Sequence, residues 1–147
     1  MLVAMLGDLS KRLLGRVAAF VFHDEVRLFE IFSMLNLFAW AKVLLVQPDL
    51  LQHGAYRGFD AVSAILWAYF FGSVATLHLI AMLNHRRHRM ELRFVAMALA
   101  AGSWTVIAWN FWAASLSTTA NLNYTILALA CAVSGAYLAW KSTSSQY

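Results

Sequence analysis

Four long apolar stretches, separated by short polar segments, occupy most of the chain. They cover about residues 28–46, 61–83, 94–116 and 122–140. The 23 residues of the second stretch would form a helix of about 34 Å, which is enough to cross a hydrocarbon core of about 30 Å. The stretches are continuously apolar rather than alternating, and lipid cannot satisfy free backbone donors and acceptors, so helices are favoured over a β-barrel. The pattern predicts an all-α polytopic membrane protein, with four transmembrane helices in a domain over about 23–141 and a polar tail at 142–147.

Residues 1–22 show a different periodicity, which is that of an amphipathic helix. One side carries apolar residues at three- and four-residue spacing, namely Leu2, Met5, Leu6, Leu9, Leu13, Val17 and Phe20. The other side carries Asp8, Lys11, Arg12, Gly15 and Arg16. Such a helix typically lies in the headgroup plane of a membrane, so we predict an interfacial helix with anionic lipid headgroups as partners. Packing on the surface of another protein is the alternative.

Basic residues set the expected orientation, because they gather at the N-terminus, at the C-terminus and between the second and third apolar stretches. The two other connecting segments hold a single basic residue, Arg57. The positive-inside rule therefore predicts that both termini lie in the cytoplasm, with the protein in a bacterial inner membrane. The residues expected at the membrane surface are Lys11, Arg12, Arg16, Arg86, Arg87, Arg89 and Arg93.

The composition supports this picture. It argues against a soluble domain, a nucleic-acid-binding protein and a protein with an internal disulfide. Of the 147 residues, 62% are hydrophobic and 12% are charged, whereas soluble domains carry about 25% charged residues. The net charge is +4, and the basic residues lie at the ends of the apolar stretches. We therefore expect contact with lipid headgroups and none with nucleic acid. The single cysteine, Cys131, excludes an internal disulfide, and its apolar surroundings favour a buried packing role.

Small residues at four-residue spacing mark candidate packing faces. Helices with such stripes can approach closely in lipid. The second stretch carries the longest of them and the fourth a similar one, so the predicted helix-packing residues are Ala64, Ala68, Gly72, Thr76, Ala128, Ala132 and Ala136. The spacing alone leaves open whether these faces pack within one chain or between chains.

Five polar residues inside the apolar stretches are candidate functional residues, because polar groups in lipid are costly. They are Glu30, Asn36, Lys42, His78 and Asn110. Counting 1.5 Å per residue places Glu30 and His78 at similar depths near the cytoplasmic side, and Lys42 and Asn110 at similar depths near the other side. The structural alternatives are an ion pair of Glu30 with Arg27, a Lys42 side chain that extends to the headgroups, and interhelical hydrogen bonds of the asparagines.

Metal, cofactor and catalytic motifs give little signal. His78 has no second histidine at matching depth for haem, and the pair His85 and His88 lies among four arginines that oppose a cation. The motifs of P-loop nucleotide-binding proteins, zinc proteases and serine hydrolases do not occur. We therefore expect no metal, no cofactor and no enzymatic activity.

The order of landmarks over residues 26–137 resembles that of small four-span membrane proteins encoded in tailed-phage genomes. The landmarks are Arg27, Leu28, Phe29, Glu30, Trp40, Pro48, Tyr56, Trp67, His78, Leu79, Arg93, Trp104, Trp112, Thr118, Thr119, Tyr124, Ala136 and Tyr137. The resemblance implies a holin-like or virion-associated protein. Lys42 and the amphipathic N-terminal segment depart from this pattern.

Two functional hypotheses follow. The first is a self-associating membrane protein of phage type, holin-like or carried in a virion for genome delivery, which assembles as a homo-oligomer through faces such as Ala64, Ala68 and Gly72. The second is an accessory subunit of a membrane complex or a small transporter, in which the five intramembrane polar residues line an internal path. An enzyme ranks third.

Overall fold

The computed structural model describes residues 2–22, 24–52, 54–59, 61–84, 89–114 and 118–144. Within these residues the fold consists of helices without strands. Its elements are α1 (Leu2–Val21), α2 (Arg27–Val46), the 3₁₀ helices η1 (Pro48–Gln52) and η2 (Gly54–Phe59), α3 (Ala64–Leu83), α4 (Arg89–Ala113) and α5 (Thr119–Ser144). The all-α prediction is confirmed.

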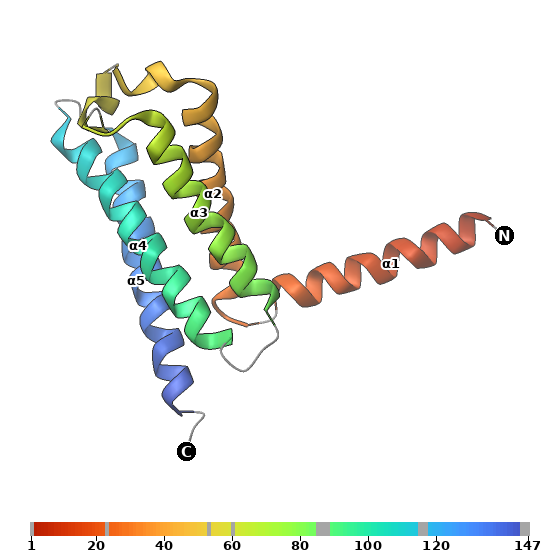
Figure 1. The fold of residues 1–147 in the computed structure, drawn as a ribbon. Helices are drawn as coiled ribbons and strands as arrows, with labels where there is room; N and C mark the ends of the chain where they lie inside the picture. Colours follow the sequence, from red (N-terminus) through yellow and green to blue (C-terminus); the bar gives the residue numbers. More distant parts are fainter. Residues whose placement is uncertain are drawn as a thin grey trace.

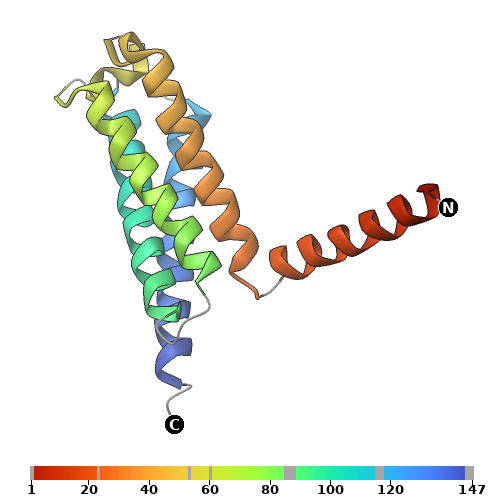
Figure 2. The same cartoon turned by 45° about the vertical axis from the view of Figure 1, so that its right-hand side comes forward.

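Helices α2 to α5 form an antiparallel bundle, and each is long and apolar enough to cross a membrane. Figures 1 and 2 show the four helices side by side, with α1 leaving the bundle at one end. We call this end, where α2 begins and α5 finishes, the terminal end. The opposite end, which carries η1 and η2, is the distal end. The largest difference from the predicted spans is at α4, which begins at Arg89 instead of residue 94.

The interior of the bundle is filled by large side chains. Leu37, Phe71, Trp104 and Ile107 come from three helices and have no exposed surface. The most extensive pairings are those of α4 with α5 and of α2 with α3. Helix α5 is the least buried of the four spans, because it packs mainly on α4.

The distal end is closed by an aromatic cluster that the sequence pattern did not predict. Residues 47–60 are the polar segment between the first two apolar stretches of the sequence. Within it, Leu51 and Phe59 are buried, and the Trp67 indole donates a hydrogen bond to the Phe59 carbonyl (3.2 Å). Around Trp40, ring centroids lie 5.7 to 6.2 Å away for Tyr56, Phe59, Phe71, Phe111 and Tyr124. Edge-to-face and offset contacts of this kind add stability beyond that of simple burial.

Gly58 allows η2 to sit against α4. A Cβ atom at this position would lie 2.6 Å from Oδ1 of Asn110 and 3.1 Å from its backbone oxygen. We therefore expect Gly58→Ala to lower the free energy of unfolding by about 1–3 kcal/mol, because the Asn110 side chain must move and the tight contact with its backbone must widen. The measurement is the unfolding midpoint in detergent as sodium dodecyl sulfate is added.

Gly102 provides the matched control for this substitution. A Cβ atom there meets nothing within 4 Å, and alanine has the higher helix propensity by about 1 kcal/mol. Gly102→Ala should therefore leave the midpoint unchanged or raise it. A midpoint that falls equally in both variants would contradict the close packing of η2 on Asn110.

Helix α1 projects away from the bundle (Figures 1 and 2). Its side chains at positions 10–20 are exposed, and among them Leu13, Leu14 and Val17 are more than half exposed. Its last turn is joined to the start of α2, where the Arg27 guanidinium lies 5.0 Å from the centre of the Phe20 ring. Over positions 10–20, the apolar side of α1 is thus left uncovered by the bundle.

Candidate functional site

The most concentrated polar structure in the described residues is an ion cluster at the terminal end, formed by Asp24, Arg27, Glu30 and Arg93. Arg93 lies in the first part of α4 and is 1% exposed. Its Nε and Nη2 atoms donate to the two carboxylate oxygens of Glu30 at 2.7 and 2.8 Å. Its Nη1 and Nη2 atoms donate to the two oxygens of Asp24 at 2.7 and 2.9 Å.

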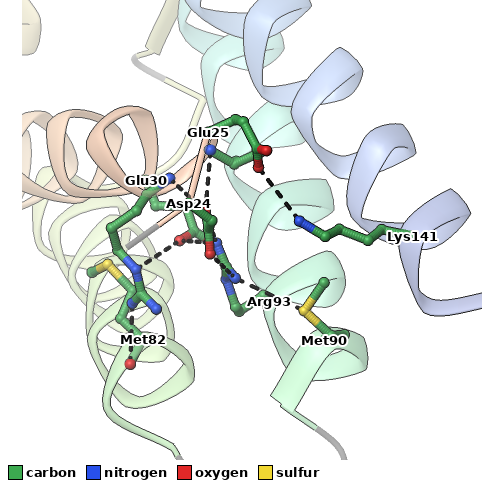
Figure 3. Close-up of polar contacts among 9 residues, drawn as sticks. Asp24, Glu25, Glu30, Met82, Met90, Arg93 and Lys141 are labelled. Atoms are coloured by element: carbon green, nitrogen blue, oxygen red, sulfur yellow. Dashed lines mark hydrogen bonds and ion pairs between the residues drawn. The ribbon is translucent and has the colours of Figure 1, made fainter. Parts of the chain in front are cut away.

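Arg93 therefore binds two carboxylates at once, each in the bidentate geometry that gives the strongest arginine pairs. A further Nη1 contact reaches the Met90 sulfur at 3.8 Å. These contacts use the five N–H donors that a guanidinium offers. Figure 3 shows Arg93 extending from α4 towards Asp24 and Glu30.

Asp24 and Arg27 connect this pair to the neighbouring elements. Oδ1 of Asp24 also accepts the backbone N–H groups of Val26 and Arg27, at 3.1 and 3.0 Å, and so holds the first residues of α2 in place. Nη1 of Arg27 donates to the carbonyl of Met82 near the end of α3 (3.1 Å). The Nε atom of Arg27 lies 3.9 Å from Glu30.

The ion cluster thus contains two carboxylates and two guanidinium groups, and its formal charges balance. Glu30, Arg27 and Arg93 are each 1% exposed. It joins α2, the turn before it, the end of α3 and the start of α4. Buried charges are stable only when they are paired and hydrogen-bonded in this way.

The placement of Arg93 corrects a prediction made from the sequence. Arg93 was expected to be a headgroup-level side chain, but it is buried in the ion cluster. The reason is that α4 begins at Arg89, so Arg93 lies one turn inside the helix rather than in the preceding connection. Glu30 has both its predicted neighbour Arg27 and the stronger partner Arg93.

The pKa of Asp24 is lowered from 3.8 to about 2. Burial of the carboxyl raises its pKa, but this effect is outweighed by the hydrogen bonds and charge of Arg93, by the Val26 N–H and by the charge of Arg27. Because the folded pKa lies below the unfolded one, the stabilisation is complete above the unfolded pKa and is lost as the pH falls from 3.8 to about 2.

This shift leads to a prediction for the variant Asp24→Asn. At neutral pH it should be less stable than the wild type, because Arg93 loses a charged partner. Between pH 3.8 and 2 it should lose less of its remaining stability than the wild type does, because the titrating group is gone. Unfolding midpoints of both proteins across this range provide the measurement, and parallel pH curves would contradict the pairing of Asp24 with Arg93.

The other predicted intramembrane polar residues each have a separate environment. The amides of Asn36 and Asn110 donate to carbonyls one turn back in their own helices, Phe32 and Val106, at 2.8 Å. Asn36 also lines two adjoining hollows of about 230 and 450 Å³ beside α5. The expected interhelical hydrogen bonds of the asparagines are therefore replaced by bonds within each helix.

His78 and Lys42 differ sharply in exposure. His78 is 1% exposed, and its Nε2 atom has no hydrogen-bond partner among the described residues. His78 lies on the inward side of α3, one turn before Met82. The carboxylate of Glu30, for which a similar depth was predicted, is bound by Arg93. Lys42 is exposed on the outer surface of α2. The structure thus gives these side chains different surroundings.

A second polar contact lies in the middle of the bundle. The Trp104 indole of α4 donates to the Ser33 hydroxyl of α2 at 2.9 Å, and that hydroxyl lies 3.5 Å from the sulfur of Cys131 on α5. Trp104 also stacks on Tyr124, with ring planes 7° apart. Cys131 is fully buried, as its apolar surroundings predicted.

The predicted small-residue faces divide into an inner and an outer group. Ala64 and Ala68 are buried within the bundle, and a Cβ atom at Gly72 would lie 3.6 Å from the Ala41 Cβ. This part of the stripe packs α3 on α2 inside one chain. The remaining residues of the two stripes lie further out. Ala128 is partly buried, and Thr76, Ala132 and Ala136 are exposed.

The predicted basic surface is visible in part. Lys11, Arg12 and Arg16 are exposed on α1. Arg86, Arg87, His85, His88 and the side chain of Arg89 lie outside the described residues. In the part of the chain that is described, no group of three or more metal-ligating side chains occurs.

Comparison of this chain with protein-family models, with curated proteins and with solved structures found no match.

Proposed function

We propose that this chain is a non-enzymatic integral membrane protein that self-associates through the outer face of α5. The observation that carries the proposal is this face, which consists of Leu129, Ala132, Val133 and Ala136. All four side chains are exposed, and the two alanines on the face would let a second helix approach closely in lipid. The resemblance noted in the sequence supports a phage setting, as a holin-like or virion-associated protein.

The interior of the bundle is filled by side chains, which favours a function carried out by its outer surfaces. The ion cluster occupies the terminal end and the aromatic cluster occupies the distal end. Between them, Leu37, Phe71, Trp104 and Ile107 are fully buried. A single bundle packed in this way would act on the membrane through assembly with further copies.

The arrangement of the ends supports a cytoplasmic location of both termini. Helix α1, the end of α3, the start of α4 and the end of α5 lie at the same end of the bundle (Figure 1). In the sequence, these segments and the residues between α3 and α4 contain most of the basic residues, which favour the cytoplasmic side. The exposed basic residues of α1 would then bind anionic lipid in the inner leaflet. Reporter fusions after Tyr147 and Met90 should both report cytoplasm, and a periplasmic signal from either would contradict this orientation.

Induced expression in a bacterial host tests the proposed function. A holin-like protein should collapse the membrane potential and then lower culture turbidity. The double variant Ala132→Leu/Ala136→Leu should insert normally but lose most of this effect, because large side chains hold the outer faces of α5 apart. The control Leu129→Ile lies on the same face and should behave like the wild type. A double variant as active as the wild type would contradict the use of this face.

An accessory subunit remains the second candidate, and the hollows beside Asn36 favour it. They lie where α2 and α5 pair only weakly, and the lining of the larger one includes Asn36, Asn123 and Tyr124. A polar partner helix could bind there. In that case Asn36→Leu should release the partner during purification, whereas Ala136→Leu should not.

A further inference from the structure

A groove runs along the outer surface between α2 and α3. It has a volume of about 730 Å³, and its lining includes Phe38, Ala41, Gly72, Ser73 and Thr76. Most of the lining is apolar, and it includes the small residues Ala41, Ala68 and Gly72. If the bundle spans a membrane, this groove faces the acyl chains of the surrounding lipid.

Lys42 gives the groove a charged end. Its side chain lines the groove and is exposed, and no carboxylate of the described residues forms an ion pair with it. Lys42 lies one turn before the end of α2 at Val46. From there a lysine side chain can extend to the headgroup region and keep its stem along the apolar wall.

We propose that the α2–α3 groove is a binding site for one anionic phospholipid of the leaflet at the distal end. One acyl chain would lie along Ala41, Gly72 and Thr76, and the phosphate would bind the Lys42 ammonium. The charge of Lys42 selects an anionic over a zwitterionic headgroup, because the net charge of the lipid decides the attraction.

The charges of the chain favour a lipid over a second copy as the occupant. A second bundle seated in the groove would have to offer a carboxylate to Lys42 at the distal end. At the distal end a second copy could offer Asp49, which lies in η1 outside the four spanning helices, whereas an anionic lipid brings a phosphate and an acyl chain to the groove in one molecule. The acidic residues within the four spanning helices are Glu30 and Glu91, and both lie near the terminal end. Glu30 is moreover already bound to Arg93.

Native mass spectrometry of the full chain tests this site, with phosphatidylglycerol and phosphatidylcholine of identical acyl chains as probes. The chain carries Lys11→Gln, Arg12→Gln and Arg16→Gln, so that α1 does not contribute its own lipid binding. We expect one molecule of phosphatidylglycerol to be retained about fivefold better than phosphatidylcholine. Lys42→Gln should remove the preference. The control Lys141→Gln, whose ion pair with Glu25 lies at the other end, should keep it.

A second variant distinguishes the groove from other surfaces. Ser73→Leu/Thr76→Leu fills the groove with large side chains at two exposed positions and should release the retained lipid whatever its headgroup. A preference for phosphatidylglycerol that survives Lys42→Gln would overturn the proposal. So would lipid retention unchanged by filling the groove, or a lipid-free dimer that dissociates when the groove is filled.

Discussion

Replacing Arg93 with methionine should lower the free energy of unfolding by about 3–5 kcal/mol, which is the range for breaking a buried ion pair. The substitution leaves Glu30 buried without its bidentate partner, and it removes the link from α4 to the turn before α2. Methionine fills much of the same volume, so the effect reports the lost charge. Circular dichroism in mixed micelles, with increasing sodium dodecyl sulfate, measures the change.

Two variants show whether the ion cluster causes this loss. Lys141→Met breaks an exposed pair with Glu25, in which the side chains are 43% and 70% exposed, and should cost at most about 1 kcal/mol. The double variant Glu30→Gln/Arg93→Met should be less destabilised than the sum of its single variants, because the first substitution removes the unpaired charge. Additive effects would show that Glu30 and Arg93 do not act as a pair.

Trp104→Ala should destabilise the bundle by about 3 kcal/mol through the cavity that it leaves. The indole is fully buried, bonds Ser33 on α2 and stacks on Tyr124 of α5. It therefore joins three helices at mid-bundle. In lipid the lost contacts are not replaced by a hydrophobic driving force, so packing dominates the change.

Trp109 is the matched control, because it lies on the same helix and is 74% exposed. Trp109→Ala should change the unfolding midpoint little. Trp104→Phe should retain the stacking but lose the hydrogen bond to Ser33, at a cost of about 0.6 kcal/mol. Equal losses for Trp104→Ala and Trp109→Ala would contradict the central role assigned to Trp104.

The helices were predictable from the sequence because their signal is local. Long apolar stretches bounded by polar segments predict membrane helices without any knowledge of their neighbours. Even the helix start at Ser63 has a local cause, since its hydroxyl accepts the Leu66 N–H. The position where α4 begins was harder to predict from the sequence, because Arg89, Met90 and Glu91 are compatible with both a helix and a polar connection.

Apart from the pair of Glu30 with Arg27, the ion cluster was not predicted, because its other pairs join residues far apart in the sequence. Arg93 meets Glu30 across 63 positions, and the apolar pattern places Arg93 in a connecting segment rather than within a span. The comparison of depths that linked Glu30 to His78 could have found Arg93, which lies at the same end of a neighbouring span. The aromatic cluster was missed for a similar reason: Leu51 and Phe59 lie in a largely polar segment without a regular apolar spacing, and only the fold shows that they are buried.

Cysteine cross-linking in native membranes tests self-association through α5 most directly. In a Cys131→Ala background, Ala136→Cys places a thiol on the outer face of α5, and Ile80→Cys places one on α3, where the native side chain is 53% exposed. Under mild oxidation we expect a covalent dimer from the residue 136 variant and a monomer from the residue 80 variant. A monomer from both variants, or a dimer from the residue 80 variant alone, would contradict assembly through the outer face of α5.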